Sequence, residues 1–113
     1  MLRIVTTLTT EAIFSEDSMK RYLLKKEWDV QKPKLTIVML APSEASGIEL
    51  DSTTQLVLHN AARLEYGGVS VVNLFATLND FSLKQTDNED PENMDAIIQA
   101  AKEADVIVYA PGV

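Results

Sequence analysis

The sequence predicts an α/β domain, with a two-layer or three-layer parallel core of three strands and crossover helices, plus an N-terminal antiparallel hairpin. Three apolar, β-branched runs carry this prediction, at 35–40, 69–75 and 106–109. Strands that are buried on both faces read in this way. Helix-like segments separate the runs, and the order strand, helix, strand, helix, strand is typical of parallel sheets covered by helices.

The hairpin is predicted from residues 11–15 and 20–28, joined by a turn at residues 16–18. Apolar and polar residues alternate along the second run, which suits a strand with one face partly buried. Residues 1–10 are apolar and β-branched, and we interpret them as either another edge strand or a loose tail. Residues 29–34, which contain Pro33, are predicted to be a linker.

The first crossover helix is predicted to begin at Ser52, because Ser52 and Gln55 have the spacing of a capping box. We expect Gly67-Gly68 to end it, since glycine adopts the left-handed conformation without steric cost. An i, i+4, i+7 spacing predicts its buried stripe, formed by Val57, Ala61 and Leu64.

The second crossover helix is predicted from a cap at Asp90, a first-turn proline at Pro91 and an acidic residue, Glu92, near the positive end of the helix. Asp105 then introduces the third core strand. The helical stripe predicted to face the core consists of Met94, Ile97, Ile98 and Ala101.

Length and composition indicate a single α/β domain over residues 1–113, since 113 residues do not provide two cores. The absence of cysteine excludes disulfides, thiolate zinc sites and a cysteine nucleophile. The first thirty residues contain no long apolar run, so neither a signal peptide nor a membrane span is expected and we predict a cytoplasmic protein.

The net charge of −7 is unevenly distributed. The segment 20–34 carries +4, and the rest of the chain carries −11. An acidic surface repels a polyanion, so the net charge disfavours nucleic acid as a partner, although this basic ribbon leaves it open. The alternative interpretation is a sheet edge that lysines protect from aggregation. A homodimer is also left open.

Candidate binding residues follow from topology, because ligands of such folds bind beyond the carboxyl ends of the strands. A loop containing Pro42 and Ser43 follows the first core strand, and Asn73 and Phe75 close the second. A buried amide needs partners, and at a strand end it could contact the donor and acceptor edge of a ligand. Asp51 is placed at the same rim. The structural alternatives are that Ser43 caps a turn, that Asp51 merely precedes the helix cap and that Asn73 holds the neighbouring loop.

Several other chemistries are disfavoured. His59, the only histidine, falls inside the first helix, and no G-x-S-x-G elbow is present to make Ser43 a nucleophile. The loop after the first core strand lacks the glycine pattern of a phosphate-binding loop. The acidic residues between 87 and 95 lack the spacing of a calcium loop. No metal and no cofactor are predicted, and no catalytic residue is identified.

Seven short motifs, taken together, resemble domain of unknown function 1643 (DUF1643), an uncharacterised family of bacterial and phage proteins. The resemblance extends from about residue 14 to the last residue. The motifs are Arg21-Tyr22, Trp28-Asp29, the block 40–45, Asp51 with Thr53, the block 66–68, the block 73–76 and the block 105–107.

The family has no established activity, and its strand-and-loop pattern is similar at fold level to the uracil-DNA glycosylase superfamily. That similarity implies a base-binding pocket in which Asn73 contacts the base edge. The chain departs from the family at Ala41, at Gln55-Leu56 and at Pro111-Gly112. The family continues with a further helix and strand, so we expect this chain to be C-terminally truncated relative to it.

Three functional hypotheses remain. The first is a domain that binds a small molecule resembling a nucleotide or a nucleobase at the carboxyl ends of the core strands. The second is a glycosylase-like hydrolase of N-glycosidic bonds. The third is a non-enzymatic interaction module that uses the N-terminal hairpin.

Overall fold

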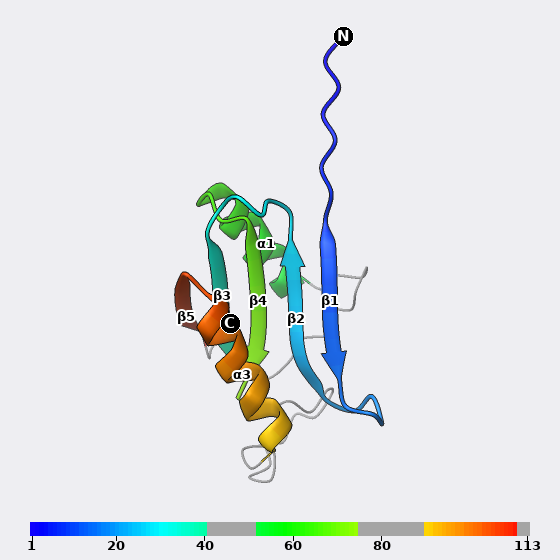
Figure 1. Ribbon diagram of the computed structural model, residues 1–113, viewed down its shortest axis with the longest axis vertical. Helices are drawn as coiled ribbons and strands as arrows, with labels where there is room; N and C mark the ends of the chain where they lie inside the picture. Colours follow the sequence, from blue (N-terminus) through cyan, green and yellow to red (C-terminus); the bar gives the residue numbers. More distant parts are fainter. Residues whose placement is uncertain (41–51, 75–89, 111–113) are drawn as a thin grey trace.

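The computed structural model describes residues 1–40, 52–74 and 90–110, and the fold is given for these residues. They form one mixed sheet with the strand order β1-β2-β4-β3-β5, and two helices (Figure 1). The elements in chain order are β1 (Thr9–Phe14), β2 (Arg21–Glu27), β3 (Lys34–Met39), α1 (Ser52–Arg63), β4 (Gly68–Asn73), α3 (Pro91–Glu103) and β5 (Val106–Ala110).

The α/β class is confirmed, and the predicted parallel core is found in part. Strand β3 pairs in parallel with β4 and with β5, whereas β2 pairs antiparallel with both β1 and β4. The hairpin is therefore not an addition beside the core but a continuation of the same sheet. Its second strand, β2, lies between β1 and β4, and its residues are buried at Arg21, Tyr22, Leu24 and Lys26 and partly buried at the other positions.

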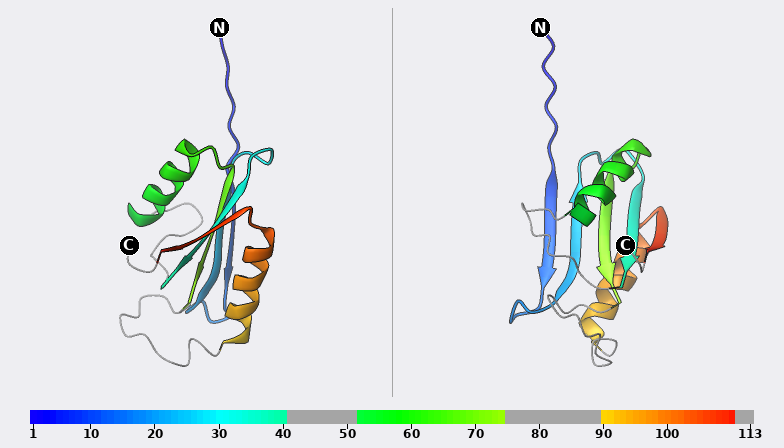
Figure 2. Two further views of the ribbon diagram at one scale, coloured as in Figure 1. Left: turned by 90° about the vertical axis from the view of Figure 1, so that its left-hand side faces the viewer. Right: turned by 180° about the vertical axis from the view of Figure 1, so that it is seen from behind.

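The two helices cover opposite faces of the sheet (Figure 2, left). The face under α1 holds the hydrophobic core, to which α1 contributes Ala61 and, at its margin, Val57 and Leu58. The face under α3 is more polar: the hydroxyl of Thr36 on β3 donates to the carbonyl of Ala100 at 2.9 Å. The strands contribute the rest of the core cluster, formed by Leu24, Leu35, Ile37, Met39, Val69 and Val71.

Helix α1 begins at Ser52, as the sequence predicts, but it ends at Arg63 and not at the glycines. The left-handed residue after it is Glu65, with φ 68°. The amide of Tyr66 donates to the carbonyl of Ala61 at 3.0 Å, and that of Glu65 to Ala62 at 3.2 Å, which together form a Schellman motif. Because the helix ends here, Leu64 leaves the predicted stripe and is exposed.

Gly67 is required by close packing and not by a left-handed backbone. A Cβ atom at this position would lie 2.0 Å from the carbonyl oxygen of Asp29. That approach lets the carbonyl of Gly67 accept from the amides of Trp28 and Asp29, at 2.8 and 3.0 Å. The glycine thus joins the end of β2 to the start of β4.

Helix α3 has the predicted cap, because the side chain of Asp90 accepts from the amides of Glu92 and Asn93, and Pro91 occupies the first turn. The predicted stripe is wrong in part. The residues of α3 that are buried against the sheet are Asn93 and Ala100, whereas Met94 and Ile98 are exposed. The periodicity located an apolar side of the helix, but the polar residue Asn93 lies at the contact with the sheet.

Residues 1–8 have neither helix nor strand and extend away from the sheet in the direction of β1 (Figure 1). This segment fits the loose-tail interpretation, and β1 begins only at Thr9. Within the described ranges, neither helix combines the length and the apolar character that crossing a membrane requires.

Candidate functional site at the carboxyl end of β4

Several elements meet at one end of the sheet. Strands β3 and β4 are parallel and end there at Met39 and Asn73, which are register partners. Strand β2 runs the opposite way beside β4, so its first residue, Arg21, lies at the same end. The first turn of α3 also lies there, since a hydrogen bond joins Asn93 to the last residue of β4 (Figure 1).

The side chain of Asn73 is the most unusual group at this end. Asn73 follows Val71 by two residues along β4 and pairs with Met39, and both of these residues belong to the core under α1. Because every second residue of a strand shares a face, the side chain of Asn73 also lies on the face of the sheet that α1 covers. It is fully buried, with an exposed fraction of 0%. Among the described residues, neither its amide nitrogen nor its amide oxygen has a hydrogen-bond partner. Buried amides are almost always bonded, so the amide of Asn73 calls for an explanation.

Asn93 is a second buried amide with a different role. Its Nδ2 donates to the carbonyl of Asn73 at 2.9 Å and makes a longer contact, 3.4 Å, with the carbonyl of Leu74. Its Oδ1 accepts no hydrogen bond from the residues that the structure describes. These bonds hold the end of β4 against α3, and we therefore assign Asn93 a positioning role.

Asp90 is the centre of a polar cluster beside these amides. Its Oδ2 accepts from Nζ of Lys20 at 3.0 Å, and it also accepts from the hydroxyl of Tyr22. Burial by itself would raise the pKa of Asp90, but these hydrogen bonds and the charge of Lys20 outweigh it and hold the pKa below its ordinary value. Burial and the same carboxylate raise the pKa of Tyr22, so its phenol stays protonated.

Arg21 adds a positive charge to this end of the sheet, and its side chain has an exposed fraction of 0%. It begins β2 just where the pairing with β1 shifts register between Ile13 and Phe14. A buried guanidinium is rare and depends on polar surroundings. The carboxyl end of β4 thus combines a buried cation with a buried amide.

Only one of the predicted site residues can be compared with the structure. Asn73 is buried at the end of its strand, as expected. Pro42, Ser43, Asp51 and Phe75 lie outside the described residues, so their placement remains a prediction. Sequence reasoning did not select Arg21, Tyr22 or Asn93 as site residues. Arg21-Tyr22 was a signal within the family resemblance, whereas nothing in the pattern of α3 marked Asn93.

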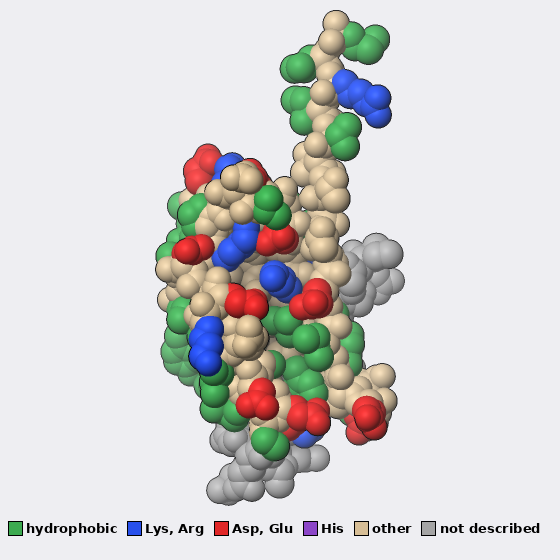
Figure 3. All heavy atoms as spheres, in the orientation of Figure 1, with side chains coloured by type: hydrophobic (Ala, Val, Ile, Leu, Met, Phe, Trp, Pro, Cys, Tyr) green, Lys and Arg blue, Asp and Glu red, His purple; other side chains and the backbone are tan. Residues whose placement is uncertain are grey.

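The basic ribbon at 20–34 is largely neutralised by carboxylates. Besides Lys20, the chain pairs Lys25 with Glu103 at 3.9 Å, Lys32 with Glu65 at 3.0 Å and Lys34 with Glu27 at 3.3 Å. Basic and acidic side chains consequently alternate on the face seen in Figure 3. Lys26 is buried, and its Nζ donates to the hydroxyl of Thr10 at 3.1 Å. This arrangement offers little free positive charge to a polyanion.

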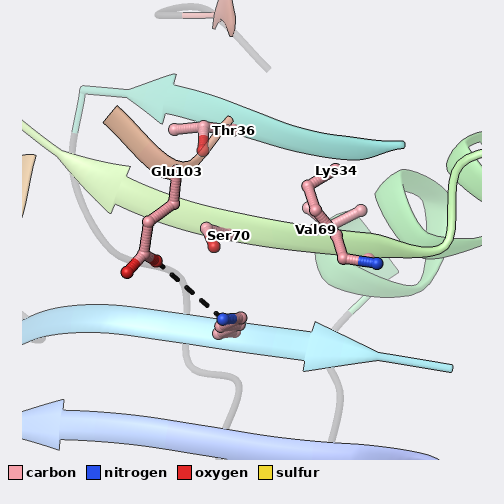
Figure 4. A pocket seen from close by; sticks show the side chains of 7 residues that line it. Lys34, Thr36, Val69, Ser70 and Glu103 are labelled. Atoms are coloured by element: carbon pink, nitrogen blue, oxygen red, sulfur yellow. Dashed lines mark ion pairs between the residues drawn. The ribbon is translucent and has the colours of Figure 1, made fainter. Parts of the chain in front are cut away.

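The cavity beside the pair of Lys25 and Glu103 is too small for a ligand. Figure 4 shows Glu103 reaching from α3 past Ser70 towards β2, with Thr36 behind it. The space enclosed is about 10 Å³, which holds at most one water molecule. Polar side chains fill this part of the sheet face under α3, so it does not offer a binding site for a small molecule.

A larger apolar hollow of about 330 Å³ lies between the N-terminal segment, the end of β2 and α1. His59 lines it together with Thr6, Leu8 and Trp28. His59 is exposed on α1, inside the helix that the sequence predicts for it. Within the described part of the chain, no group of three histidine, aspartate or glutamate side chains could hold a metal ion.

Comparison with known proteins identifies a family for this chain, but that family has no assigned activity. The family model for DUF1643, protein of unknown function, matches residues 21–113. This range begins at the buried Arg21 and includes Asn73, Asp90 and Asn93, whereas Lys20 precedes it. Searches of the curated proteins and of the solved structures returned no match to the chain.

Proposed function

We propose that this chain, which belongs to the DUF1643 family of proteins of unknown function, binds a small molecule at the carboxyl end of β4. The ligand class is a nucleobase or nucleotide, or another planar molecule with adjacent hydrogen-bond donors and acceptors. The observation that carries the proposal is the amide of Asn73, fully buried and without a hydrogen-bond partner among the described residues.

The chemistry of the amide supports this ligand class. A primary amide offers two N–H donors and one carbonyl acceptor in one plane. A nucleobase edge presents the complementary pattern and can form two hydrogen bonds with it. Leaving such an amide unbonded in a buried site costs about 1–3 kcal/mol, and a ligand that pairs with it recovers this energy on binding.

The surroundings of Asn73 support binding more than catalysis. A general base must be free to take a proton at the working pH. The carboxylate beside the site, Asp90, is already held by Lys20, by Tyr22 and by two backbone amides of α3, and its pKa is lowered. Such a carboxylate is a weak base. We therefore propose ligand binding as the primary function and no reaction.

The test is a ligand panel on two matched variants and the wild type. The panel contains nucleobases, nucleosides, nucleotides and free sugars, and the readout is the melting temperature followed by calorimetric titration of any compound that raises it. Asn73→Ala removes the proposed contact. Asn60→Ala is the control, because Asn60 lies exposed on α1 and its side chain donates to the carbonyl of Leu56, one turn earlier.

We expect at least one base-containing compound to stabilise the wild type and Asn60→Ala, and to bind Asn73→Ala about tenfold more weakly or worse. Stabilisation by free sugars alone would contradict the ligand class. Absence of stabilisation by every compound at millimolar concentration, or equal binding by Asn73→Ala, would overturn the proposal.

A further inference from the structure

The direction of the Arg21 side chain determines which face of the sheet carries its charge. The residues on either side of it, Lys20 and Tyr22, both contact the carboxylate of Asp90. Asp90 caps α3, so these two side chains point to the face of the sheet that α3 covers. Because successive side chains of an extended chain point to opposite faces, Arg21 points to the face that α1 covers. Asn73 lies on this same face.

A bulge in β2 accounts for this direction. Leu24 belongs to the core under α1, so in a regular strand Tyr22 would share its face and Arg21 would lie on the other. However, consecutive residues of β1 pair with Leu23 and Arg21, and the pairing skips Tyr22. An extra residue of this kind shifts the alternation of the strand and redirects the side chains beyond it. The bulge thus turns the guanidinium of Arg21 towards the α1 face.

Arg21 and Asn73 occupy neighbouring positions on this face. Their strands, β2 and β4, are adjacent in the sheet, at the usual spacing of about 4.8 Å, and Leu24 pairs there with Val71. Asn73 lies two residues beyond Val71 on β4. Arg21 lies three residues before Leu24 on β2, and one of these three is the extra residue of the bulge. Because both side chains have an exposed fraction of 0%, a guanidinium and an amide are buried together at the carboxyl end of β4.

Positive and negative charges are divided between the two faces of the described sheet. The described strands carry two carboxylates, Glu11 and Glu27, and both line one hollow with Lys25, which pairs with a carboxylate on α3. They therefore lie on the α3 side, where acidic and basic side chains alternate (Figure 3). Helix α1 contains no acidic residue. The described elements on the α1 side thus combine apolar side chains with the charges of Arg21 and of the buried Lys26.

We propose that the ligand of the Asn73 site carries an oxyanion, a phosphate or a carboxylate, which the guanidinium of Arg21 binds. This assignment rests on the proposed function and narrows its ligand class to anionic molecules. A guanidinium presents parallel N–H groups that match two oxygens of a phosphate or carboxylate. Such charge-assisted hydrogen bonds are about twice as strong as neutral ones, and in a buried site the solvent weakens them little.

The two buried groups have complementary tasks in this arrangement. The amide of Asn73 offers donors and an acceptor in one plane and contacts the base, whereas Arg21 contacts the anionic group. The carboxylate of Asp90 does not oppose an anion here, because it lies on the α3 side of the sheet and is paired with Lys20 at 3.0 Å. A nucleotide has both the planar edge and the phosphate, and a base with a ring carboxylate has them in a more compact form.

The first test compares the common ribonucleosides with their monophosphates, and uracil with its ring carboxylate, by calorimetric titration. The readout is the ratio of the two dissociation constants in each pair, which a purely structural role of Arg21 would not change. We expect the wild type to bind the anionic member of at least one pair about tenfold or more tightly, and the pair that shows this gain identifies the source of the oxyanion. Arg21→Gln should bring the ratio close to one. Arg21→Lys should leave an intermediate ratio, because lysine keeps the charge but not the fork of donors.

Arg63→Gln is the matched control for these titrations. Arg63 is exposed in the last turn of α1, which leads to the start of β4 and not to its carboxyl end. The same substitution at this position should leave the ratio at its wild-type value.

The second test uses only the wild type and therefore does not depend on whether a chain without its buried arginine folds. Inorganic phosphate should weaken binding of the anionic compound and leave binding of its neutral partner unchanged. Potassium chloride at the same ionic strength controls for screening and should weaken the anionic compound clearly less.

The outcomes separate this assignment from the proposed function. If neutral bases bind through Asn73 but an oxyanion brings no gain, or if Arg21→Gln leaves the ratio unchanged, the role of Arg21 is refuted and the proposed function stands. Inorganic phosphate that is no more effective than chloride also refutes the role of Arg21. If no base-containing compound binds at all, the proposed function fails, and the assignment of Arg21 fails with it.

Discussion

The contrast between the two buried asparagines gives the sharpest test of how the site was interpreted. Asn73 and Asn93 are both almost completely buried and lie next to each other, since one accepts a hydrogen bond through its backbone from the side chain of the other. The amide of Asn93 holds the end of β4, whereas that of Asn73 has no partner among the described residues. The same substitution, asparagine to alanine, should therefore have different consequences at the two positions.

The expected magnitudes follow from the hydrogen bonds. Asn93→Ala leaves the buried carbonyl of Asn73 without its donor at 2.9 Å, at a cost of about 1–3 kcal/mol. Removing the unbonded Oδ1 of Asn93 offsets part of this cost. We therefore expect the free energy of unfolding to fall by about 2 kcal/mol. Asn73→Ala leaves a small cavity, which is destabilising, but it also removes a buried amide without a partner, which is stabilising. We therefore expect the free energy of unfolding of this variant to lie within about 0.5 kcal/mol of the wild-type value.

The assay is urea unfolding of the ligand-free protein at neutral pH, with thermal unfolding as a second measure. For a chain of this size, 2 kcal/mol corresponds to a difference in melting temperature of roughly 8 °C between the two variants. Asn73→Leu checks the same point with the branch at Cγ retained. If Asn73→Ala and Asn73→Leu both destabilise the protein as much as Asn93→Ala, the amide of Asn73 is structural and the argument for a ligand fails.

Three further predictions concern the parts of the fold that position the site. Asp90→Asn keeps a cap but loses the charge paired with Lys20, so at pH 7 the free energy of unfolding should fall by about 1–2 kcal/mol. Because the folded pKa of Asp90 is lowered, its contribution is complete above the unfolded pKa of about 3.9 and is lost as the pH falls through the folded value. The gap between wild type and variant in urea unfolding should therefore close on acidification, and a gap that is constant down to pH 2 would contradict the assignment. Glu65→Gly should raise the free energy of unfolding by about 0.5–1 kcal/mol, because glycine adopts the left-handed conformation at the end of α1 more easily and the exposed pair with Lys32 contributes little; a loss in thermal unfolding would show that this pair matters more. Gly67→Ala should cost about 3 kcal/mol or more, since its Cβ would meet the backbone of Asp29, while Gly68→Ala, whose nearest neighbour is the flexible side chain of Lys34, should cost clearly less. Equal unfolding midpoints for the two glycine variants would refute that distinction.

The sequence by itself determined the elements and the class of the fold. Short runs rich in β-branched residues predict strands. A cap such as Asp90-Pro91 predicts the start of a helix, because its hydrogen bonds and fixed backbone angle involve only neighbouring residues. The predicted start of α1 at Ser52 and all three core strands agree with the structure to within one or two residues. Asn73 could also be selected, because the polar residue stands at the end of an apolar run and topology gives strand ends a functional meaning.

Only the tertiary structure decided how the elements meet. Local pattern does not state which strands pair, so the antiparallel contact of β2 with β4 and the position of β5 at an edge followed from the fold alone. The same holds for Asn93, which lies outside the predicted apolar stripe of α3 but is buried against β4. The end of α1 at Arg63, followed by the left-handed Glu65, was equally hidden from the sequence, because Gly67 is required by the approach of Asp29, a residue far away in the chain, and not by the helix end. Long-range contacts, which no window of sequence contains, decide which polar groups are buried together, and for that reason the site became visible only in the folded chain.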